Sequence, residues 1–403
     1  MPQLSERGRA LPASPIRKLV PYADAAKKRG VKVYHLNIGQ PDLPTPQKAL
    51  DALLRIDRST LEYSPSQGLA SLREKLVGYY GRFGIQVSAD EIIVTTGGSE
   101  ALLYTFFACL NPGDEIIMTE PSYANYLSFA QTAGLVVKTV TSRIENGFAL
   151  PPIAEFERII SPKTRAILIC NPNNPTGYLY SREELETLRE IVLKHDLFLF
   201  SDEVYREFVY TDAPYVSALT LKGLREHAIV IDSMSKRYSE CGTRVGMVVT
   251  HNKELYATIM KYCQARLSPP LLGQIVAEAS IEGTEDYARA CYEEYIARRN
   301  FFIDGLNRIE GVHSPMPNGA FYTVVELPVA DAEDFCSWLL TDFAYRETPD
   351  AQPETVMMAP AAGFYSDREL GRRQVRMAYV LNIHELGRAL KVLEAALQAY
   401  NAR

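Results

Sequence analysis

Residues 165–201 read RAILICNPNNPTGYLYSREELETLREIVLKHDLFLFS and contain a complete strand–helix–strand unit. Arg165–Cys170 and Leu197–Ser201 are short apolar runs, the pattern of strands that are covered on both faces. Between them, Arg182–His195 has the charged, amphipathic spacing of a surface helix. Two buried strands joined by a helix predict neighbouring parallel strands in an α/β sheet.

The same alternation extends on both sides of this unit. Helices are predicted over Ser99–Leu110 and Ser122–Ala133. Further strands are predicted over Glu91–Thr95, Glu115–Thr119, Leu135–Val140, Ala228–Asp232 and Arg244–Thr250. The sequence therefore predicts an α/β fold with a mainly parallel central sheet and helices on both sides.

After about Thr250 the alternation becomes less regular, which is typical of a smaller α+β domain. Helices are predicted over Asn252–Arg266, Pro269–Ile309, Asp331–Asp342 and Ile383–Leu397, and strands over Ala320–Leu327, Thr355–Met358 and Gln374–Tyr379. The Pro-rich N-terminal residues are expected to lie over another surface. We predict an arm that includes part of the small domain (1–47), a large domain (48–290) and a small C-terminal domain (291–403).

Composition excludes several classes of protein. The 403 residues carry 43 Lys and Arg against 49 Asp and Glu, a net charge of −6, which disfavours nucleic-acid binding. The six cysteines have no CxxC spacing, so neither a zinc site nor a disulfide framework is expected. No secretory signal or membrane-length apolar run is present in the sequence, and we expect a cytoplasmic protein that binds no metal, membrane or nucleic acid.

Three polar groups directly follow predicted strands. Lys236 comes after Ala228–Asp232, and Asp202 follows the strand 197–201, with Tyr205 three residues further on. The segment Asn171–Gly177, with two prolines, holds Asn174 in a rigid turn. Each of these alone is also compatible with a surface loop. Together they point to a ligand site at the carboxyl edge of the sheet, where a desolvated lysine suits Schiff-base chemistry.

Other residues could hold anions or a flat ring. Gly98, Ser99 and Glu100 lie where a strand gives way to a helix, a position that favours a phosphate but also suits an ordinary helix cap. Arg244 and Arg376 are candidate anion ligands, although surface arginines are common. Tyr123 follows the strand 115–119, where an aromatic side chain could stack on a flat ring or pack in the core.

In combination, these motifs resemble the class I/II aminotransferases, which are pyridoxal-phosphate enzymes of fold type I. The motifs occur in family order, and the likeness runs from Asn37–Asp42 to the C-terminus. The resemblance implies that Lys236 forms the aldimine with pyridoxal 5′-phosphate and later shuttles a proton. It also implies that Asp202 pairs with the ring nitrogen, and that Tyr205 and Asn174 bind the ring oxygen.

The resemblance assigns the remaining candidates as well. Tyr123 matches the ring-stacking aromatic, and Arg376 with Asn174 matches the clamp for the substrate α-carboxylate. Gly39 matches the segment that closes over substrate. Tyr63 resembles the tyrosine that reaches the phosphate of the neighbouring subunit, which implies a homodimer with shared active sites. The implied phosphate site consists of Gly98, Ser99, Ser233 and Arg244, and Glu100 is expected among the cofactor-binding residues.

The substrate is expected to be aspartate-like or broad in range, with a 2-oxo acid such as 2-oxoglutarate as acceptor and a role in amino acid biosynthesis. Arg266 lies where some relatives supply an arginine for a distal carboxylate. Ser99 occupies a position where some relatives have a lysine. The sequence of residues 237–244 also departs from the common family pattern. Aromatic or alanine aminotransferases, a carbon–sulfur β-lyase and a 1-aminocyclopropane-carboxylate-synthase-like enzyme remain open. A DNA-binding regulator on this fold is disfavoured. Such regulators carry an N-terminal DNA-binding domain, and here the sequence that resembles the aminotransferase family begins by about residue 13.

Overall fold

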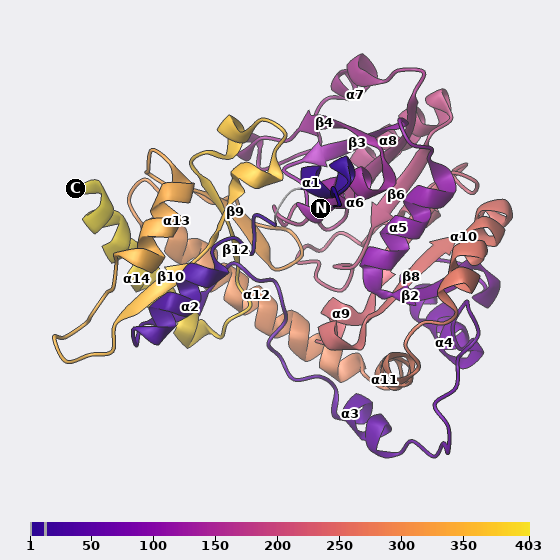
Figure 1. Ribbon diagram of the computed structural model, residues 1–403, viewed down its shortest axis with the longest axis horizontal. Coiled ribbons are helices and arrows are strands. Elements are labelled where there is room, and N and C mark those ends of the chain that lie inside the picture. The colour runs from indigo at the N-terminus through magenta and orange to yellow at the C-terminus, as the bar shows by residue number, and fades with distance from the viewer. Residues whose placement is uncertain (1, 12–13) are drawn as a thin grey trace.

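The structure is a computed structural model that describes residues 2–11 and 14–403 (Figure 1). A larger part contains a seven-stranded sheet, and a smaller part contains the C-terminus and two smaller sheets. The long helix α12 (Glu285–Arg308) leads from one part to the other. The predicted boundary between residues 290 and 291 therefore falls within a continuous helix.

The seven-stranded sheet has the order β2-β8-β7-β6-β5-β3-β4. Only β8 among them is antiparallel to its neighbours, so the predicted mainly parallel sheet is confirmed. Each predicted strand is present within one or two residues. The strands are β2 (Ile92–Thr96), β3 (Glu115–Glu120), β4 (Val136–Thr141), β5 (Thr164–Cys170), β6 (Phe198–Asp202), β7 (Ala228–Ser233) and β8 (Val245–Thr250).

The central strands are apolar throughout because both of their faces are covered. In β5, Ala166 and Leu168 pack into one core cluster, and Ile167 and Ile169 pack into another on the opposite face. Each fully buried Ile or Leu side chain stabilises the fold by about 1.5–3 kcal/mol. This explains why the sequence of β5 lacks the alternation of a strand with one wet face.

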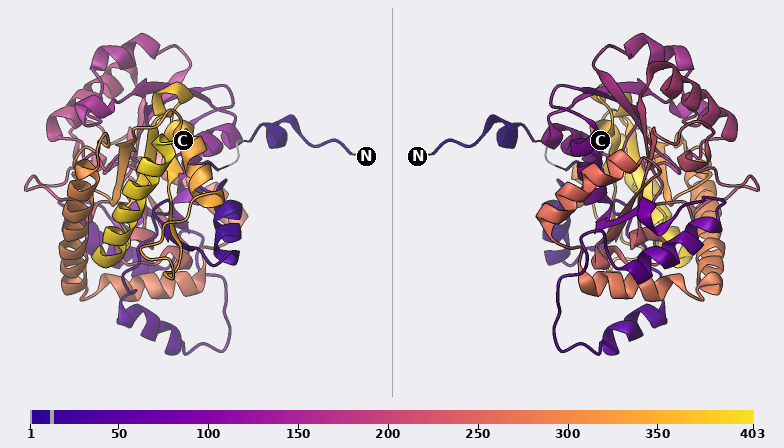
Figure 2. Two further views of the ribbon diagram at one scale, coloured as in Figure 1. Left: turned by 90° about the vertical axis from the view of Figure 1, so that its left-hand side faces the viewer. Right: turned by 90° about the vertical axis from the view of Figure 1, so that its right-hand side faces the viewer.

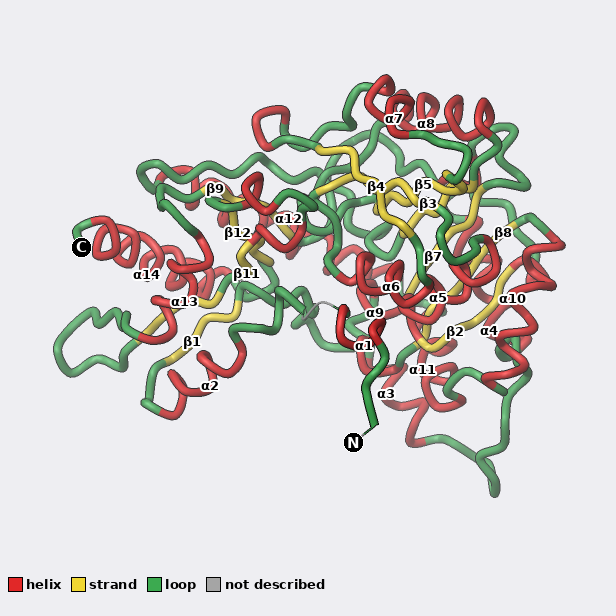
Figure 3. Tube along the Cα trace, turned by 45° about the horizontal axis from the view of Figure 1, so that its top comes forward, coloured by secondary structure: helices red, strands yellow, loops and turns green. Residues whose placement is uncertain are grey.

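Helices cover both faces of this sheet, as Figure 3 shows. One face packs against α5 (Gly97–Cys109), α6 (Asn125–Ala133) and α10 (Lys253–Arg266). The other face packs against α4 (Ala70–Gly81), α7 (Ile153–Ile159), α8 (Arg182–His195) and α11 (Leu271–Ile281). Helix α3 (Gln47–Leu54) lies beside α11 at the lower edge of Figure 1.

Local signals define α8, the helix of the opening strand–helix–strand unit. The Ser181 Oγ accepts a hydrogen bond from the Glu184 backbone N–H at 3.1 Å, and the Glu184 carboxylate accepts one from the Ser181 N–H at 2.7 Å. This capping box satisfies two backbone donors that the helix itself leaves free. The helix ends at Asp196, which has a left-handed backbone. The predicted bounds of α8 are confirmed because the caps are encoded locally.

The smaller part combines both ends of the chain. β9 (Tyr322–Glu326), β11 (Ala359–Pro360) and β12 (Gln374–Ala378) form an antiparallel sheet. β1 (Lys32–His35) pairs in parallel with β10 (Glu354–Met357), so N-terminal residues join this part. Its helices are α2 (Val20–Lys28), α13 (Ala332–Thr341) and α14 (Ile383–Asn401). Figure 2 shows α1 (Glu6–Ala10) projecting from the body.

Candidate active site

A cavity of about 650 Å³ opens at the edge of the large sheet where β5, β6 and β7 end. Parallel strands end at the same edge, so the residues that follow them meet there. β8 runs in the opposite direction, and its first residue therefore lies at this edge. The predicted residues that line the cavity are Gly39, Gly98, Ser99, Tyr123, Asn174, Asp202, Tyr205, Ser233, Lys236, Arg244 and Arg376.

Lys236 lies in the short helix α9 (Met234–Arg237), which directly follows β7. Its Nζ donates a hydrogen bond to the Gly39 carbonyl at 3.0 Å and lies 3.8 Å from the Cys241 Sγ. The turn into α9 is held by the Ser233 hydroxyl, which accepts from the Ser235 N–H at 3.2 Å. A half-buried amine in a polar cavity can act as a nucleophile and as a carrier of protons.

Asp202 ends β6 and is 7% exposed. Its Oδ2 accepts a hydrogen bond from the Tyr126 hydroxyl at 2.6 Å, and its Oδ1 accepts one from the Val204 N–H at 3.3 Å. Burial raises the pKa of this carboxyl to about 6. A cationic N–H of a ligand beside it would favour the ionised carboxylate, and the carboxylate would keep that N–H protonated.

A chain of hydrogen bonds connects Arg376 of β12 with residues that follow β5 and β6. The Arg376 Nη1 donates to the Asn174 Oδ1 at 3.2 Å, and the Asn174 Nδ2 donates to the Tyr205 hydroxyl at 3.4 Å. The Tyr205 and Tyr322 hydroxyls lie 3.1 Å apart.

The Arg376 guanidinium is nearly fully buried, and it also donates to the Asn37 carbonyl. Its Nε is buried and has no hydrogen-bond partner within the part of the chain that the structure describes. Burial lowers the pKa of Arg376 from its ordinary value. A ligand carboxylate would offer the free donor a partner and would stabilise the buried charge, which makes Arg376 a candidate carboxylate site.

The start of α5, the Ser233 turn and Arg244 form an anion cradle. Gly97 has a φ of +74°, and a Cβ there would lie 2.3 Å from the Arg244 Nη2, so this approach requires glycine. The Arg244 Nη1 donates to the Cys241 carbonyl at 3.0 Å. The Ser233 and Ser235 hydroxyls, 2.8 Å apart, line the same cavity. Hydroxyls, a guanidinium and the N-terminus of α5 are suitable donors for a phosphate group.

These groups together fit the pyridoxal phosphate that the sequence resemblance implies. The amine, the buried carboxylate, the Asn174–Tyr205 pair and the anion cradle lie around one cavity. Tyr123 adds an aromatic wall, and its hydroxyl accepts a hydrogen bond from the Asn125 Nδ2 at 2.8 Å. The cavity thus offers partners for each polar group of that cofactor and a surface for its ring.

Three predicted site residues do not line this cavity. Tyr63 is 76% exposed. The Glu100 carboxylate accepts a hydrogen bond from the Thr96 N–H at 2.7 Å and lies 3.4 Å from the Arg266 Nη1. The Arg266 Nη2 donates to the Ser66 carbonyl at 3.0 Å. Arg266 is therefore engaged within its own protomer, and its predicted role toward substrate stays a prediction.

Sequence reasoning missed several residues of the site. Tyr126 holds Asp202, Tyr322 contacts Tyr205, and Ser235 and Arg17 line the cavity. Tyr126 could have been found because it lies three residues after Tyr123, in the segment that follows β3. No comparable signal marks Tyr322 or Arg17, since neither follows a strand of the large sheet.

A cluster of buried charges supports the site from behind. The Arg206 Nη1 lies 3.1 Å from the Asp232 Oδ2, and its Nη2 lies 3.0 Å from the Glu203 Oε2. Arg237 also pairs with Asp232. Glu203 directly follows Asp202, and Arg237 directly follows Lys236. The four charges balance, and they connect the backbone beside the candidate carboxylate to the backbone beside the candidate amine.

Asp232→Asn is expected to destabilise the protein by on the order of 3 kcal/mol, because it leaves two buried arginines with one carboxylate. Chemical denaturation measures the change. Asp90→Asn is the matched control, since its carboxylate is 94% exposed and lies 3.5 Å from Arg73. The control is expected to cost less than about 1 kcal/mol. Equal effects of the two substitutions would contradict a structural role for the buried cluster.

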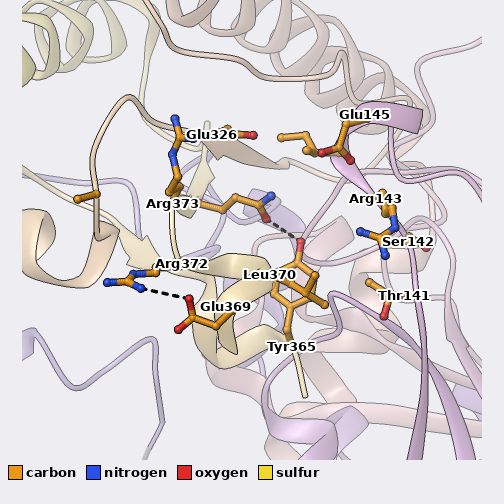
Figure 4. A pocket seen from close by; sticks show the side chains of 13 residues that line it. Thr141, Ser142, Arg143, Glu145, Glu326, Tyr365, Glu369, Leu370, Arg372 and Arg373 are labelled. Atoms are coloured by element: carbon orange, nitrogen blue, oxygen red, sulfur yellow. Dashed lines mark hydrogen bonds and ion pairs between the residues drawn. The ribbon is translucent and has the colours of Figure 1, made fainter. Parts of the chain in front are cut away.

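A second groove, of about 610 Å³, lies beside η2 (Ile144–Asn146) and η6 (Arg368–Gly371) (Figure 4). Its charges largely pair with one another, as in the 3.2 Å contact between Arg372 and Glu369. Across residues 2–11 and 14–403, no cluster of three or more His, Cys, Asp or Glu side chains suits a metal ion. In the same residues, no helix combines the length and apolarity needed to cross a membrane.

Comparison with known proteins agrees with this geometry. Residues 31–363 match the family model described as aminotransferase class I and II. The aspartate aminotransferase of Thermotoga maritima is 31% identical over 400 residues, which cover 98% of this chain and 100% of that protein. The match extends over the whole of both parts of the fold.

Solved structures give the same result. The structure of aspartate aminotransferase from Thermus thermophilus with maleate matches with a TM-score of 0.88 and 29% identity, covering 98% of this chain and 100% of that one. Alanine aminotransferase from Pyrococcus furiosus matches with a TM-score of 0.88 and 28% identity, with the same coverage. The backbone is therefore equally similar to proteins named for different amino donors.

Proposed function

The chain belongs to the class I and II aminotransferase family and is a transaminase, and we propose that its amino donor is an aspartate-like L-amino acid and its acceptor a 2-oxo acid such as 2-oxoglutarate. One observation carries this proposal. Lys236, Asp202 and Arg376 line a single cavity, although they come from separate segments of the chain. Amino-group transfer needs an amine, a buried acid and a buried cation that binds the substrate carboxylate.

The family depends on pyridoxal phosphate, and the proposed binding residues follow from the geometry of the cavity. Asp202 is proposed to bind the ring nitrogen, Tyr205 and Asn174 the ring oxygen, and Tyr123 one face of the ring. Gly98, Ser99, Ser233 and Arg244 are proposed to bind the phosphate. When bound, the cofactor supplies a sink for the electrons that remain on the substrate Cα after deprotonation.

The residues of the chain then have distinct tasks. Arg376 and Asn174 hold the substrate α-carboxylate, which fixes the direction of the Cα–H bond relative to the ring. The Lys236 Nζ lies in the same cavity and would serve as the base that takes the proton from the substrate Cα and holds it for return. Asp202 keeps the ring nitrogen protonated, because an ion pair away from water favours both charged forms. Closure of the Gly39 segment excludes water from the cavity.

A dicarboxylic donor is favoured over alanine by the chemistry of relatives and of the cavity. The Thermus structure is described with maleate, a dicarboxylate. The cavity is also rich in positive charge, since Arg17, Lys236, Arg244 and Arg376 line it against the single carboxylate of Asp202. Such a site favours substrates with additional negative charge. Alanine stays the second candidate, because the Pyrococcus alanine aminotransferase has the same fold.

We also propose a homodimer in which Tyr63 reaches the phosphate site of the neighbouring subunit. Around α3 and the following loop, Leu54 is 85% exposed and Tyr63 is 76% exposed. Large apolar side chains exposed together are typical of a surface that another subunit covers. A cytoplasmic location is proposed from the six cysteines, all unpaired, which suit a reducing compartment. Light scattering after size-exclusion chromatography measures the oligomeric state.

A donor panel tests the proposed function. The purified protein with pyridoxal phosphate is incubated with aspartate, glutamate, alanine, phenylalanine or cysteine, with and without 2-oxoglutarate. We expect aspartate or glutamate to give the corresponding oxo acid only when an acceptor is present. Formation of pyruvate and ammonia from cysteine without an acceptor would instead identify a lyase. Preference for alanine or phenylalanine would overturn the dicarboxylic assignment.

Arg376→Ala is expected to lower kcat/KM about 10- to 100-fold for donor and acceptor alike, because a buried charged hydrogen bond to the α-carboxylate contributes about 1.5–3 kcal/mol. Most of the change should appear in KM. Arg376→Lys should recover part of the loss, since it keeps the charge but not the planar fork. Steady-state kinetics for both substrates measure the effect. Unchanged kinetics in Arg376→Ala would remove this residue from the substrate site.

A further inference from the structure

Arg17 is a cavity residue that the proposed mechanism does not use. It lies in the N-terminal segment just before α2, and Ser14, Ile16 and Arg17 all line the active-site cavity. The Arg17 side chain is exposed, and its guanidinium makes no hydrogen bond or ion pair with any residue that the structure describes. Its neighbour Lys18, by contrast, pairs with Glu333 of α13 at 2.5 Å.

The backbone beside Arg17 is connected to the candidate carboxylate clamp. The Asn37 Nδ2 donates a hydrogen bond to the Ile16 carbonyl at 3.3 Å, and the Asn37 carbonyl accepts one from the Arg376 guanidinium. Arg17 therefore follows directly on a residue whose position is coupled to Arg376. A substrate held by its α-carboxylate at Arg376 extends its side chain within the cavity that Arg17 also lines.

The electrostatics place the charge of Arg17 near the aromatic wall. Burial raises the pKa of Tyr123 to about 12, and Arg17 is among the cations that oppose this rise. Arg17 and Tyr123 both line the active-site cavity. Since Tyr123 lines the same cavity, the charge of Arg17 acts on the space that a bound substrate enters.

The other cations of the cavity already have tasks. Lys236 is the reacting amine, Arg244 belongs to the anion cradle, and Arg376 binds the α-carboxylate under the proposed function. Arg266, the predicted ligand of a distal carboxylate, is only 13% exposed and is engaged by Glu100 and the Ser66 carbonyl. Ser99 carries no charge. Within the described lining of the cavity, Arg17 is the cation left over for a second substrate anion.

We propose that Arg17 binds the distal carboxylate of dicarboxylic amino acids and oxo acids, and so determines the substrate preference of this enzyme. Its planar guanidinium can bind a carboxylate through two parallel hydrogen bonds, which lysine cannot do. Because Arg17 is on the N-terminal segment, the second carboxylate also links that segment to the bound substrate. This inference rests on the proposed transaminase function and specifies its substrate class.

The experiment compares Arg17→Ala, Arg17→Lys and Lys18→Ala with the unmodified holoenzyme. In Arg17→Ala, kcat/KM for aspartate and glutamate should fall about 10- to 100-fold, while kcat/KM for alanine changes less than about 3-fold. Arg17→Lys should give an intermediate loss for the dicarboxylic substrates. Lys18→Ala is the matched control, because it removes an adjacent cation that pairs with Glu333 outside the cavity.

A binding measurement tests the same point without turnover. Calorimetry with the holoenzyme should show that Arg17→Ala weakens succinate binding about 10-fold or more and leaves butyrate binding unchanged. Equal loss for aspartate and alanine, or equal effects in Arg17→Ala and Lys18→Ala, would overturn the role of Arg17. If the unmodified protein transaminates no donor at all, it is the proposed function that fails.

Discussion

Lys236→Ala is expected to reduce amino-group transfer by about four orders of magnitude, because it removes the group that both links to the cofactor and moves the proton. The fold should be retained, since the Nζ contacts only the Gly39 carbonyl and the Cys241 Sγ. Single-turnover assays with aspartate measure the rate. Circular dichroism and thermal unfolding check that the variant is folded.

Chemical trapping gives an independent test of the same residue. Borohydride reduction of the holoenzyme should attach the cofactor to Lys236, and peptide mass spectrometry identifies the labelled site. The exposed Lys222 serves as the control, because Lys222→Ala should keep full activity and the same label on Lys236. Label on any other lysine, or substantial turnover by Lys236→Ala, would contradict the assignment of the amine.

Asp202→Ala is expected to lower kcat by about 100- to 5,000-fold, because a buried ion pair that loses one partner typically costs about 3–5 kcal/mol. Asp202→Asn is the sharper variant, since it keeps the shape and can still accept the hydrogen bond from Tyr126. It should therefore separate loss of charge from loss of packing. A kcat within about threefold of the unmodified enzyme for Asp202→Asn would show that no cationic nitrogen depends on this carboxylate.

Asp202→Asn is expected to lower activity, but it should increase the free energy of unfolding of the cofactor-free protein at high pH. The pKa of Asp202 is raised from 3.8 to about 6 by burial, so the folded state favours the protonated acid. The stability that this acid contributes is complete below about pH 4 and is lost as the pH rises through about 6. At pH 8 the Asn variant should therefore be more stable than the unmodified protein, by on the order of 3 kcal/mol. Denaturation at pH 4 and pH 8 measures this, and an equal difference at both pH values would contradict it.

Much of the site could be predicted because its residues follow strands. Asp202 ends a buried strand, and Asn174 and Lys236 lie within about four residues of the end of one, so the end of each strand and its polar residue are visible together in the sequence. The helix caps of α8 are equally local. Signals of this kind depend on neighbours in the chain and need no knowledge of the rest of the fold.

The remaining contacts could not be predicted in this way, because they join distant segments. Arg376 reaches Asn174 across 202 positions, and Tyr322 reaches Tyr205 across 117. The contact between Arg266 and Glu100 could not be predicted from the sequence either. An arginine at a helix end has the same local sequence whether it faces a neighbouring residue or a ligand. Arg17 lies in a segment without regular strand or helix spacing, and only its position over the cavity gives it a role.

The sequence by itself determined the order of strands and helices, the burial of both sheet faces and the chemical groups available at the strand ends, because apolar periodicity and local capping are properties of short segments. The tertiary structure alone decided the direction of β8. Because β8 is antiparallel to β7, Arg244, just before β8 begins, lies at the edge of the sheet where the active-site cavity opens. It also decided that β12 of the smaller part presents Arg376 to Asn174. The physical reason is that strand direction and packing between the two parts depend on long-range burial and hydrogen bonding, which no short stretch of sequence encodes.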